Sequence, residues 1–451
     1  MSDSESPPYK ELALLISSLS SLSEGDIRRK RKDDPDFNEF VASLYKFLQI
    51  DKIRAKAVRM NTRIPRHIRK ADRAPVIKVQ LGDGDEHSPE ICYMCKHKIM
   101  APSEHPSLCA PCCEVNKYYL EAPLDLSGRF AIVTGGRVKV GYHIALRLLR
   151  AGATVAVTSR FPGDTEARYS READYATWSD RLLIYAVDFR YVKHIDEFVN
   201  SIKACTDHVD ILVNNAAQTI RRPSAYYEHL IPCETEYALK GASQNGILRP
   251  PNTHAQLVPK ELPSSVIANI TNTGVLDICD RADFPEGQLD IDGQQLDLRP
   301  DNTWTRNIGA TKIEECVETM VVNSISPFYI IQQLEPLFRL EGAGAGRNYI
   351  INITSAEGRF NGLSLPQHPH NNMSKAALNM LTQVLGRDYY QRCNTIVVGI
   401  DTGWANVMVG PTAMARLTYW DSAARAIQPL VDKDAHKYIG KQLRNFQLVE
   451  W

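Results

Sequence analysis

From residue 129 onward, short apolar runs alternate with longer segments in which apolar residues recur every three or four positions. The first pattern predicts buried strands, and the second predicts amphipathic helices. Strands that alternate with helices form a parallel sheet covered on both faces, so we predict a doubly wound α/β domain over residues 124–451. The predicted strands are residues 130–135, 154–159, 182–188, 209–215 and 348–355.

One long segment, residues 218–310, interrupts this alternation. It is rich in proline, asparagine, aspartate and glycine and contains only brief apolar runs. A connection of this length in a compact domain is usually either functional or disordered. We predict an insertion near the edge of the sheet that serves as a substrate lid or a partner-binding surface, with an inert excursion as the alternative.

The N-terminal region, residues 1–88, has a different composition. Serine-rich tracts accompany a basic run at residues 28–32, and apolar residues recur with helical spacing between Phe37 and Leu48. Ten lysines and arginines lie between Lys52 and Lys78, with no aromatic residues among them to stack on bases. We predict a small helical element and a solvated or disordered basic face, with nucleic-acid contact and a nuclear signal as the alternatives.

The charge of the whole chain is balanced, with 53 lysines and arginines against 53 aspartates and glutamates. No net field therefore attracts nucleic acid or an anionic membrane. No run approaches the roughly 18 apolar residues that a membrane helix needs, and the N-terminus lacks the basic-then-apolar order of a secretory signal. We expect an intracellular protein in the cytoplasm, with the nucleus as the alternative, and neither a membrane nor nucleic acid among its partners.

Five of the ten cysteines lie between residues 92 and 113. Two Cys-x2-Cys pairs, Cys92 with Cys95 and Cys109 with Cys112, offer the four thiolates that structural zinc prefers. We therefore predict a closed, structural zinc site in a small module of residues 89–120. A redox role is disfavoured because nothing thioredoxin-like surrounds the pairs. The alternative ligands are Cys113, His97 and His105.

A glycine-rich turn, residues 135–141, follows the first strand and leads into a helix. Glycines at such a turn let the backbone approach a pyrophosphate, which then meets the amides and the positive end of the helix. Further motifs follow in order after the next three strands: Ser159 with Arg160, Asp188, and an Asn-Asn-Ala-Ala run that begins at Asn214. This ordered set resembles the short-chain dehydrogenase/reductase family, and the resemblance implies a Rossmann fold that continues to the C-terminus.

In that family the turn reads Thr-Gly-x-x-x-Gly-x-Gly, which puts Thr134, Gly135 and Gly141 in register and Lys139 where the middle glycine belongs. The lysine either weakens nucleotide binding or supplies a cation to the phosphates, and we favour the cation. Arg160 stands where NAD-preferring members carry an acidic residue, so the resemblance implies NADP, with NAD disfavoured. The remaining cofactor contacts implied by the resemblance are Asp188 at the adenine, Asn214 and Ala216 at the adenosine ribose, Lys375 at the other ribose, and Gly403.

The resemblance also implies four catalytic positions: an asparagine, a serine that orients the substrate oxygen, a tyrosine that acts as acid or base, and a lysine that lowers the tyrosine pKa. Asn323, Ser355 and Lys375 occupy three of them. The tyrosine position, one helical turn before Lys375, holds Asn371. An amide cannot exchange a proton near neutral pH, so the usual route through a tyrosinate is closed.

Two histidines precede the same helix. His368 lies thirteen residues after Ser355, a spacing at which the family often has its tyrosine, and His370 is nearer to Lys375. Histidine titrates near neutrality, so His370 is a candidate replacement acid. The more ordinary interpretation is that both histidines line or cap a loop. Hydride transfer without a strong acid would be slower by roughly 10² to 10⁴.

These observations favour an NADP(H)-dependent oxidoreductase that acts on a carbonyl or alcohol in a small molecule whose identity the sequence does not give. The alternative is a catalytically silent NADP-binding protein with a regulatory or scaffold role. Family members commonly pair through the helix that here starts near Ile313 and the helix that carries Lys375, so the resemblance also implies a homo-oligomer.

Overall fold

The structure is a computed structural model, and it describes residues 91–101, 103–239, 281–299, 301–338, 347–360, 366–405 and 415–451. The predicted N-terminal region and the middle of the insertion lie outside these residues. All described residues belong to the second of the two units into which the chain divides, residues 81–451.

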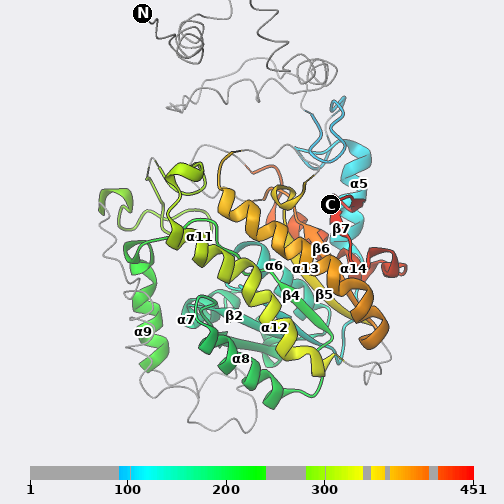
Figure 1. Cartoon of the computed structure of the whole chain (residues 1–451), viewed down its shortest axis with the longest axis horizontal. Helices are drawn as coiled ribbons and strands as arrows, with labels where there is room; N and C mark the ends of the chain where they lie inside the picture. The colour runs from blue at the N-terminus through cyan, green and yellow to red at the C-terminus, as the bar shows by residue number, and fades with distance from the viewer. Residues whose placement is uncertain are drawn as a thin grey trace, which may run out of the picture. The chain divides into compact units, whose positions relative to one another are not determined.

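In the described part of the chain, eight strands form one sheet in the order β3-β2-β1-β4-β5-β6-β7-β8 (Figure 1). Strands β1 to β7 run parallel, and β8 pairs antiparallel with β7. The predicted doubly wound sheet and its five predicted strands, which are β1 to β5, are confirmed. The predicted strands do not include β6, which is seven residues long and fully buried, and the three-residue strands β7 and β8 are too short to give a periodic pattern. The strands are β1 Phe130–Val133, β2 Thr154–Ser159, β3 Leu182–Ala186, β4 Ile211–Asn214, β5 Asn348–Thr354, β6 Thr395–Asp401, β7 Gln442–Arg444 and β8 Gln447–Val449.

Helices connect the successive parallel strands, β1 to β7, as a parallel sheet requires. The α-helices described are α5 Ala110–Glu121, α6 Lys139–Arg150, α7 Pro162–Tyr169, α8 Val192–Cys205, α9 Ile231–Leu239, α11 Ile313–Met320, α12 Ser326–Leu334, α13 Pro369–Cys393 and α14 Tyr419–Val431. A π-helical turn, η7 Val321–Ile325, joins α11 to α12. The short 3₁₀ helices are η2 Tyr175–Thr177, η3 Ser179–Arg181, η4 Ser224–Leu230, η5 Arg281–Asp283, η6 Ile308–Ala310, η8 Glu335–Leu337, η9 Ala356–Gly358 and η10 Ala435–Tyr438.

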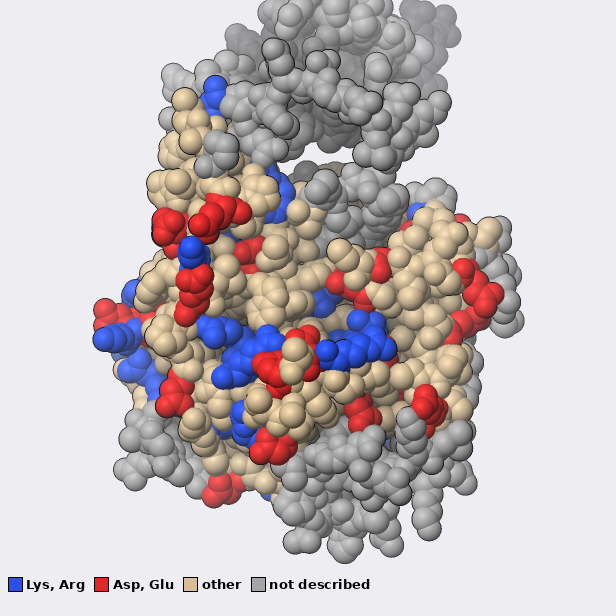
Figure 2. All heavy atoms as spheres, turned by 180° about the vertical axis from the view of Figure 1, so that it is seen from behind, with Lys and Arg blue, Asp and Glu red and all other residues tan. Residues whose placement is uncertain are grey.

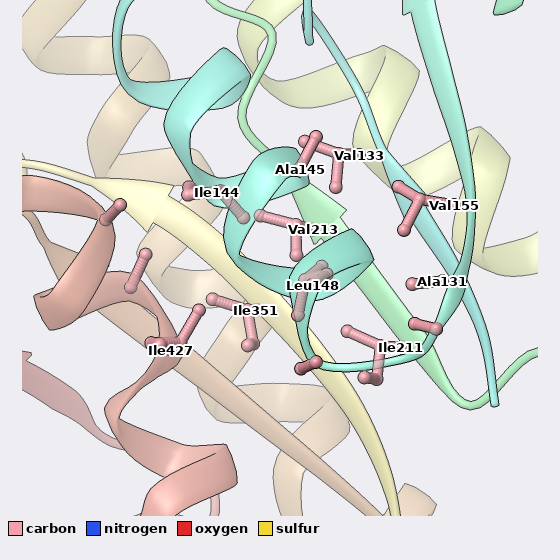
Figure 3. Close-up of a cluster of buried hydrophobic side chains, with 14 of the residues drawn as sticks. Ala131, Val133, Ile144, Ala145, Leu148, Val155, Ile211, Val213, Ile351 and Ile427 are labelled. Atoms are coloured by element: carbon pink, nitrogen blue, oxygen red, sulfur yellow. The ribbon is translucent and has the colours of Figure 1, made fainter. Parts of the chain in front are cut away.

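Two apolar cores lie on the two faces of the sheet. On one face, α6 and α14 pack on the central strands, and Figure 3 shows Leu148 and Ile427 of these helices among side chains such as Val213 and Ile351. The other core joins the strands to α8, α12 and α13. Each fully buried aliphatic side chain contributes about 1.5–3 kcal/mol through removal from water, so these cores hold the strand ends in fixed positions.

The strand order reverses between β1 and β4, because β1 continues to β2 on one side while β4 continues to β5 on the other. In open α/β sheets, ligands bind in the crevice outside the carboxyl ends of the strands at such a switch point. The segments that follow β1 and β4 therefore border the main candidate site.

The cysteine-rich module packs directly on the sheet domain, because α5 lies against α14. Asp421 of α14 is 2% exposed and holds this contact. Its Oδ1 accepts a hydrogen bond from Nδ2 of Asn116 (2.6 Å), and its Oδ2 lies 3.1 Å from Nε2 of His105. The same Oδ2 accepts from the amide of Thr418, which closes a capping box at the start of α14.

The described parts of the insertion lie beside the carboxyl ends of β1 and β2. Residues 218–239 leave β4 and form η4 and α9, and residues 281–299 return to the domain. Two contacts define this placement: the amide of Gly163 donates to Glu234 (3.0 Å), and Nη2 of Arg137 donates to Gln294 (2.5 Å).

None of the helices among the described residues combines the length and the apolar character needed to cross a membrane.

Replacement of Asp421 by alanine tests the contact between the module and α14. The change leaves Asn116 and the amide of Thr418 without their buried acceptor, so we expect the free energy of unfolding to fall by about 2–4 kcal/mol. Urea denaturation measures this loss. The exposed Asp434→Ala variant is the matched control and should stay within about 0.5 kcal/mol of the parent; an equal effect of both changes would contradict the assignment.

Candidate functional site

The glycine-rich turn joins β1 to α6. Gly135 has a φ of +68°, and a Cβ at this position would lie 3.0 Å from the Cα of Ala216. A Cβ at Gly141 would lie 2.3 Å from both the carbonyl oxygen of Gly135 and Nδ2 of Asn215. Only glycine fits these positions. The start of α6 has no capping side chain and no acidic residue in its first turn, so its positive end suits an anion.

Lys139 begins α6 with a φ of +59°, a left-handed conformation that costs a side-chain-bearing residue roughly 1–2 kcal/mol. Its Nζ lies 3.9 Å from Oδ2 of Asp290 and 3.9 Å from Oδ2 of Asp292, both in the returning part of the insertion. Burial lowers the pKa of Lys139, and the two carboxylates offset this only in part. The predicted cation is therefore present at the turn, but its charge faces the insertion.

Arg160 follows β2 and also faces the insertion. Its Nη2 donates to the hydroxyl of Tyr227 (2.8 Å), and its guanidinium lies 4.7 Å from the centre of the Tyr227 ring. Ser159 turns inward, because its Oγ accepts from the amide of Phe161 (2.9 Å). The cation expected at a 2′-phosphate is thus held by an aromatic ring and a hydroxyl.

Asp188 follows β3 and is paired with Arg190. Nη2 of Arg190 lies 2.6 Å from Oδ2 of Asp188, and Nε of Arg190 donates to Oδ1 (3.0 Å). Burial alone would raise the pKa of Asp188, but Arg190 and Arg160 lower it below its usual value. The carboxylate is therefore ionised and fixed at the edge of the crevice.

The residues after β4 connect that strand to the glycine-rich turn. Nδ2 of Asn214 donates to Oδ1 of Asn352 on β5 (2.8 Å), and the amide of Ala216 donates to Oγ1 of Thr134 (3.0 Å). Nδ2 of Asn215 donates to the carbonyl oxygens of Thr134 (2.9 Å) and Gly135 (3.1 Å). The Asn-Asn-Ala-Ala run thus fixes the floor of the crevice.

Ser355 follows β5, and the side chain of Lys375 reaches the same end of this strand. The Oγ of Ser355 is buried and has no hydrogen-bond partner among the residues that the structure describes. Nζ of Lys375 donates to the carbonyl oxygen of Ile353, two residues before Ser355 (2.8 Å). Burial lowers the pKa of Lys375 to about 8, although Glu357 and Asp401 oppose the change. A buried hydroxyl without a partner is suited to a ligand oxygen.

The two candidate asparagines hold the loop after β4 against α13. Asn323 lies in η7, where its Oδ1 accepts from the amide of Gln218 (2.7 Å) and its Nδ2 donates to the carbonyl oxygen of Gln218 (2.9 Å). Oδ1 of Asn371, at the start of α13, accepts from the hydroxyl of Thr219 (3.0 Å). A π-helical turn often marks a functional site, because it redirects one side chain out of the helical register.

The two histidines are bound by backbone carbonyls. The ring of His368 stacks on Trp304 at 4.3 Å, and its Nδ1 donates to the carbonyl oxygen of Trp304 (2.8 Å). His370 is 1% exposed, its Nε2 donates to the carbonyl oxygen of Thr219 (2.8 Å), and burial lowers its pKa, which favours the neutral ring. The described hydrogen bonds of His370 do not include Ser355 or Lys375, and its role as an acid stays a prediction.

The segment after β6 is supported by the cysteine module. Gly403 has a φ of +80°, and its amide donates to Oδ1 of Asp401 (3.0 Å). The amide of Trp404 donates to the hydroxyl of Tyr93 (2.8 Å), which packs with Leu417 in one apolar cluster. The module is therefore coupled to the segment that contains Gly403, one of the cofactor contacts that the resemblance implies.

The four predicted zinc ligands come together. The Sγ atoms of Cys92, Cys95, Cys109 and Cys112 all lie within 4.8 Å of one another, and those of Cys95 and Cys109 are 3.6 Å apart. Zinc–sulfur bonds of about 2.3 Å place tetrahedral sulfurs roughly 3.8 Å apart, so the quartet fits one ion. The alternative ligands Cys113, His97 and His105 lie outside this quartet.

The insertion supplies four polar side chains near the crevice that were not predicted from the sequence. They are Tyr227, Glu234, Asp290 and Asp292. Glu234 accepts from the amides of Gly163 (3.0 Å) and Asp164 (2.8 Å) at the start of α7, and burial raises its pKa to about 7. The only signal in the sequence is the local excess of acidic residues around residues 290–292, which does not reveal their partners.

The parallel sheet with its switch point between β1 and β4, the glycine-rich turn and the start of α6 define a Rossmann-type fold, in which such a crevice commonly binds a dinucleotide. Residues 129–230 match the family model of the short chain dehydrogenases. The segment that contains the glycine-rich turn and the loop after β4 is therefore similar to the short chain dehydrogenases.

One relative extends the likeness beyond this segment. Uncharacterized protein R665 of Acanthamoeba polyphaga mimivirus is 30% identical over 327 residues, which is 70% of this chain and 64% of the viral protein. The fatty acyl-CoA reductase of Acinetobacter baylyi is 33% identical over 98 residues, 22% of this chain and 32% of that enzyme. This chain thus spans less than two thirds of the length of either relative.

Among solved structures, the Pseudomonas aeruginosa RhlG/NADP active-site complex aligns with a TM-score of 0.47 and 19% identity, over 72% of this chain and 96% of that protein.

Replacement of Lys375 by methionine tests its buried charge. The pKa of Lys375 is 10.5 when exposed and about 8 in the fold, so the unfolded chain binds more protons between these values. The stability of the parent should rise with pH across this window, and below pH 8 the full cost of burial is present. After allowance for the lost hydrogen bond to Ile353, Lys375→Met should raise the free energy of unfolding at pH 7 by about 2 kcal/mol.

Urea denaturation at pH 7 and pH 10 measures this difference. The gain from Lys375→Met should shrink at pH 10, whereas the exposed Lys203→Met control should change stability little at either pH. A gain of equal size at both values would show that burial does not lower the pKa of Lys375.

Proposed function

We propose that the protein is an NADP(H)-dependent oxidoreductase that acts on a carbonyl or alcohol group of a small molecule. The observation that carries the proposal is the unpartnered, buried hydroxyl of Ser355 beside Lys375, at the carboxyl end of the strand next to the dinucleotide crevice. Two potential donors at this position suit a substrate oxygen that gains negative charge during reduction.

The chain offers a donor set that fits NADP. The start of α6 would bind the pyrophosphate, Arg160 would bind the 2′-phosphate, and Asp188 would border the adenine. Gly135 has no side chain and lies close to Ala216, so no side chain at this position would separate the backbone from the nucleotide. NADPH, when bound, supplies the hydride.

The chain's own residues would orient the substrate oxygen and stabilise its charge. The hydroxyl of Ser355 would donate to that oxygen. Lys375, with a pKa of about 8, carries a positive charge near neutral pH and would stabilise the developing alkoxide. Asn371 has no proton to give, so His370 or water would complete the transfer.

A second candidate is a catalytically silent NADP-binding protein with a regulatory or scaffold role. The observation that favours it is the use of the Asn371 side chain to hold Thr219. Turnover of carbonyl substrates with NADPH separates the two functions. An enzyme should lose about 10² to 10³ of its kcat in the Ser355→Ala variant, whereas a silent protein shows no turnover that depends on Ser355.

The cysteine quartet would hold structural zinc. Four thiolates leave no open coordination position, so the ion would stabilise the fold rather than bind substrate. Because Tyr93 contacts Trp404, the ion would also fix the segment after β6.

The protein would form a homo-oligomer through the two helical segments that the family commonly uses. Large apolar side chains on these segments are exposed, including Val317 and Phe328 on one and Met380 and Val384 on the other. Such a patch supports a protein interface. Figure 2 shows one face on which basic and acidic side chains adjoin one another, an arrangement that does not favour nucleic acid.

Arg160→Ala tests the preference for NADP. Loss of the cation should weaken NADPH binding by about 10- to 100-fold and leave NADH binding nearly unchanged, because only NADPH carries the 2′-phosphate. Isothermal titration of both nucleotides into the purified protein measures this, with the exposed Arg171→Ala variant as the control. Equal loss for both nucleotides would rule out a 2′-phosphate site at Arg160.

Cys95→Ser tests the metal site. Bound zinc should fall from about one ion per chain to well below one, because a hydroxyl is a poor zinc ligand. Elemental analysis gives the metal content. Cys316→Ser, on α11, should retain the metal. Unchanged zinc content in Cys95→Ser would remove Cys95 from the site.

A further inference from the structure

A short acidic turn of the insertion, residues 290–294, lies on the glycine-rich turn. A bridge between Leu289 and Gln295 closes it. Oδ1 of Asp290 accepts from the amides of Asp292 (2.9 Å) and Gln294 (2.8 Å), which fixes the carboxylate within the turn. This acidic turn is therefore a formed structure with defined side-chain directions.

The acidic turn contacts the basic side chains that surround the expected phosphate position. Its two carboxylates share Nζ of Lys139, at 3.9 Å each. Nη2 of Arg137 donates to Oε1 of Gln294 (2.5 Å), and Nη1 of Arg168 donates to the carbonyl oxygen of Asp292 (2.8 Å). Both Arg137 and Lys139 belong to the glycine-rich turn itself.

Polar contacts rather than apolar burial hold the acidic turn in place. Ile291, between the two aspartates, is 99% exposed. On the opposite side, the hydroxyl of Tyr419 donates to Oδ2 of Asp292 (2.5 Å). A segment that leaves its apolar side chain in water and directs its carboxylates inward is oriented by charge.

These cations are the groups that nucleotide phosphates would need. The first turn of α6 has no acidic residue of its own, and the carboxylates of the acidic turn lie 3.9 Å from Nζ of Lys139, the residue that begins this helix. A phosphate placed near Lys139 would be repelled by Asp290 and Asp292 and would compete with them for the same ammonium group. Occupation by the turn and occupation by phosphate are therefore opposed.

We propose that the acidic turn is a self-ligand of the dinucleotide site: its carboxylates stand in for nucleotide phosphates, and nucleotide binding requires their displacement. This inference rests on the proposed function, because it takes the ligand to be NADP(H). The insertion then controls access to the cofactor. When only a fraction of molecules has the site open, the apparent Kd rises by the reciprocal of that fraction.

The test is titration of NADPH, and separately of inorganic pyrophosphate, into the full-length protein and the Asp290→Asn/Asp292→Asn variant. Asparagine keeps the oxygen that accepts hydrogen bonds within the turn but removes the charge that competes with phosphate. We expect the variant to bind both probes about 10-fold more tightly or better. Asp283→Asn/Glu286→Gln removes two charges from the same segment and should leave both affinities unchanged.

Hydrogen exchange gives an independent reading on the parent protein. Saturating NADPH should increase amide exchange at residues 290–294, because the turn leaves its partners. Protection of these amides by NADPH would overturn the inference, since the turn would then close over the nucleotide.

The titration separates failure of the inference from failure of the proposed function. If the parent binds NADPH as tightly as the double asparagine variant, the self-ligand inference is wrong and the proposed function is kept. A parent that binds no NADPH, with a variant that does, upholds the self-ligand and rejects NADP as the native chain's working cofactor. Binding of neither probe to either protein rejects both.

Discussion

The close contact between the turn after β1 and the loop after β4 is the constraint on which the rest of the site depends. Nδ2 of Asn215 bonds to two carbonyl oxygens of the turn, and the backbone at Gly141 leaves no space for a side chain. This contact holds the two strand ends at the switch point of the sheet. The start of α6 therefore lies at the switch point, and the insertion begins in the loop that contacts the glycine-rich turn.

The charges around the crevice are balanced by residues far away in the sequence. Lys139 is matched by Asp290 and Asp292, and Arg137 is matched by Asp164, whose carboxylate lies 2.6 Å away. Cations that are removed from water are costly unless they are paired, so the basic side chains of the glycine-rich turn need anions near them. The insertion meets this need, which explains why polar contacts hold it while Ile291 remains in water.

Much of the fold and part of the site could be predicted from the sequence. Strands such as β2 and β5 are short, apolar and separated by helical periods, and these local signals also place Gly135, Ser355 and Lys375 at strand ends or on helices. The cysteine quartet could be predicted because its four residues form two Cys-x2-Cys pairs that lie close together in the sequence. Tyr227, Glu234 and the acidic turn could not be foreseen, because their partners lie in other segments and no periodic pattern records such pairings. Tyr93 was missed for the same reason.

Asn371, which stands where the family has its tyrosine, contacts the start of the insertion. The side chain of Asn371 accepts from the hydroxyl of Thr219, and His370 donates to the carbonyl oxygen of the same threonine. The first turn of α13 thus holds the start of the insertion at the place where the resemblance expects a proton donor. A tyrosine there would exchange this amide contact for a phenol that needs a different partner. The chain therefore keeps a serine and a lysine at two of the expected positions but has Asn371 in place of the tyrosine, and Asn371 holds the loop after β4 from which the insertion begins.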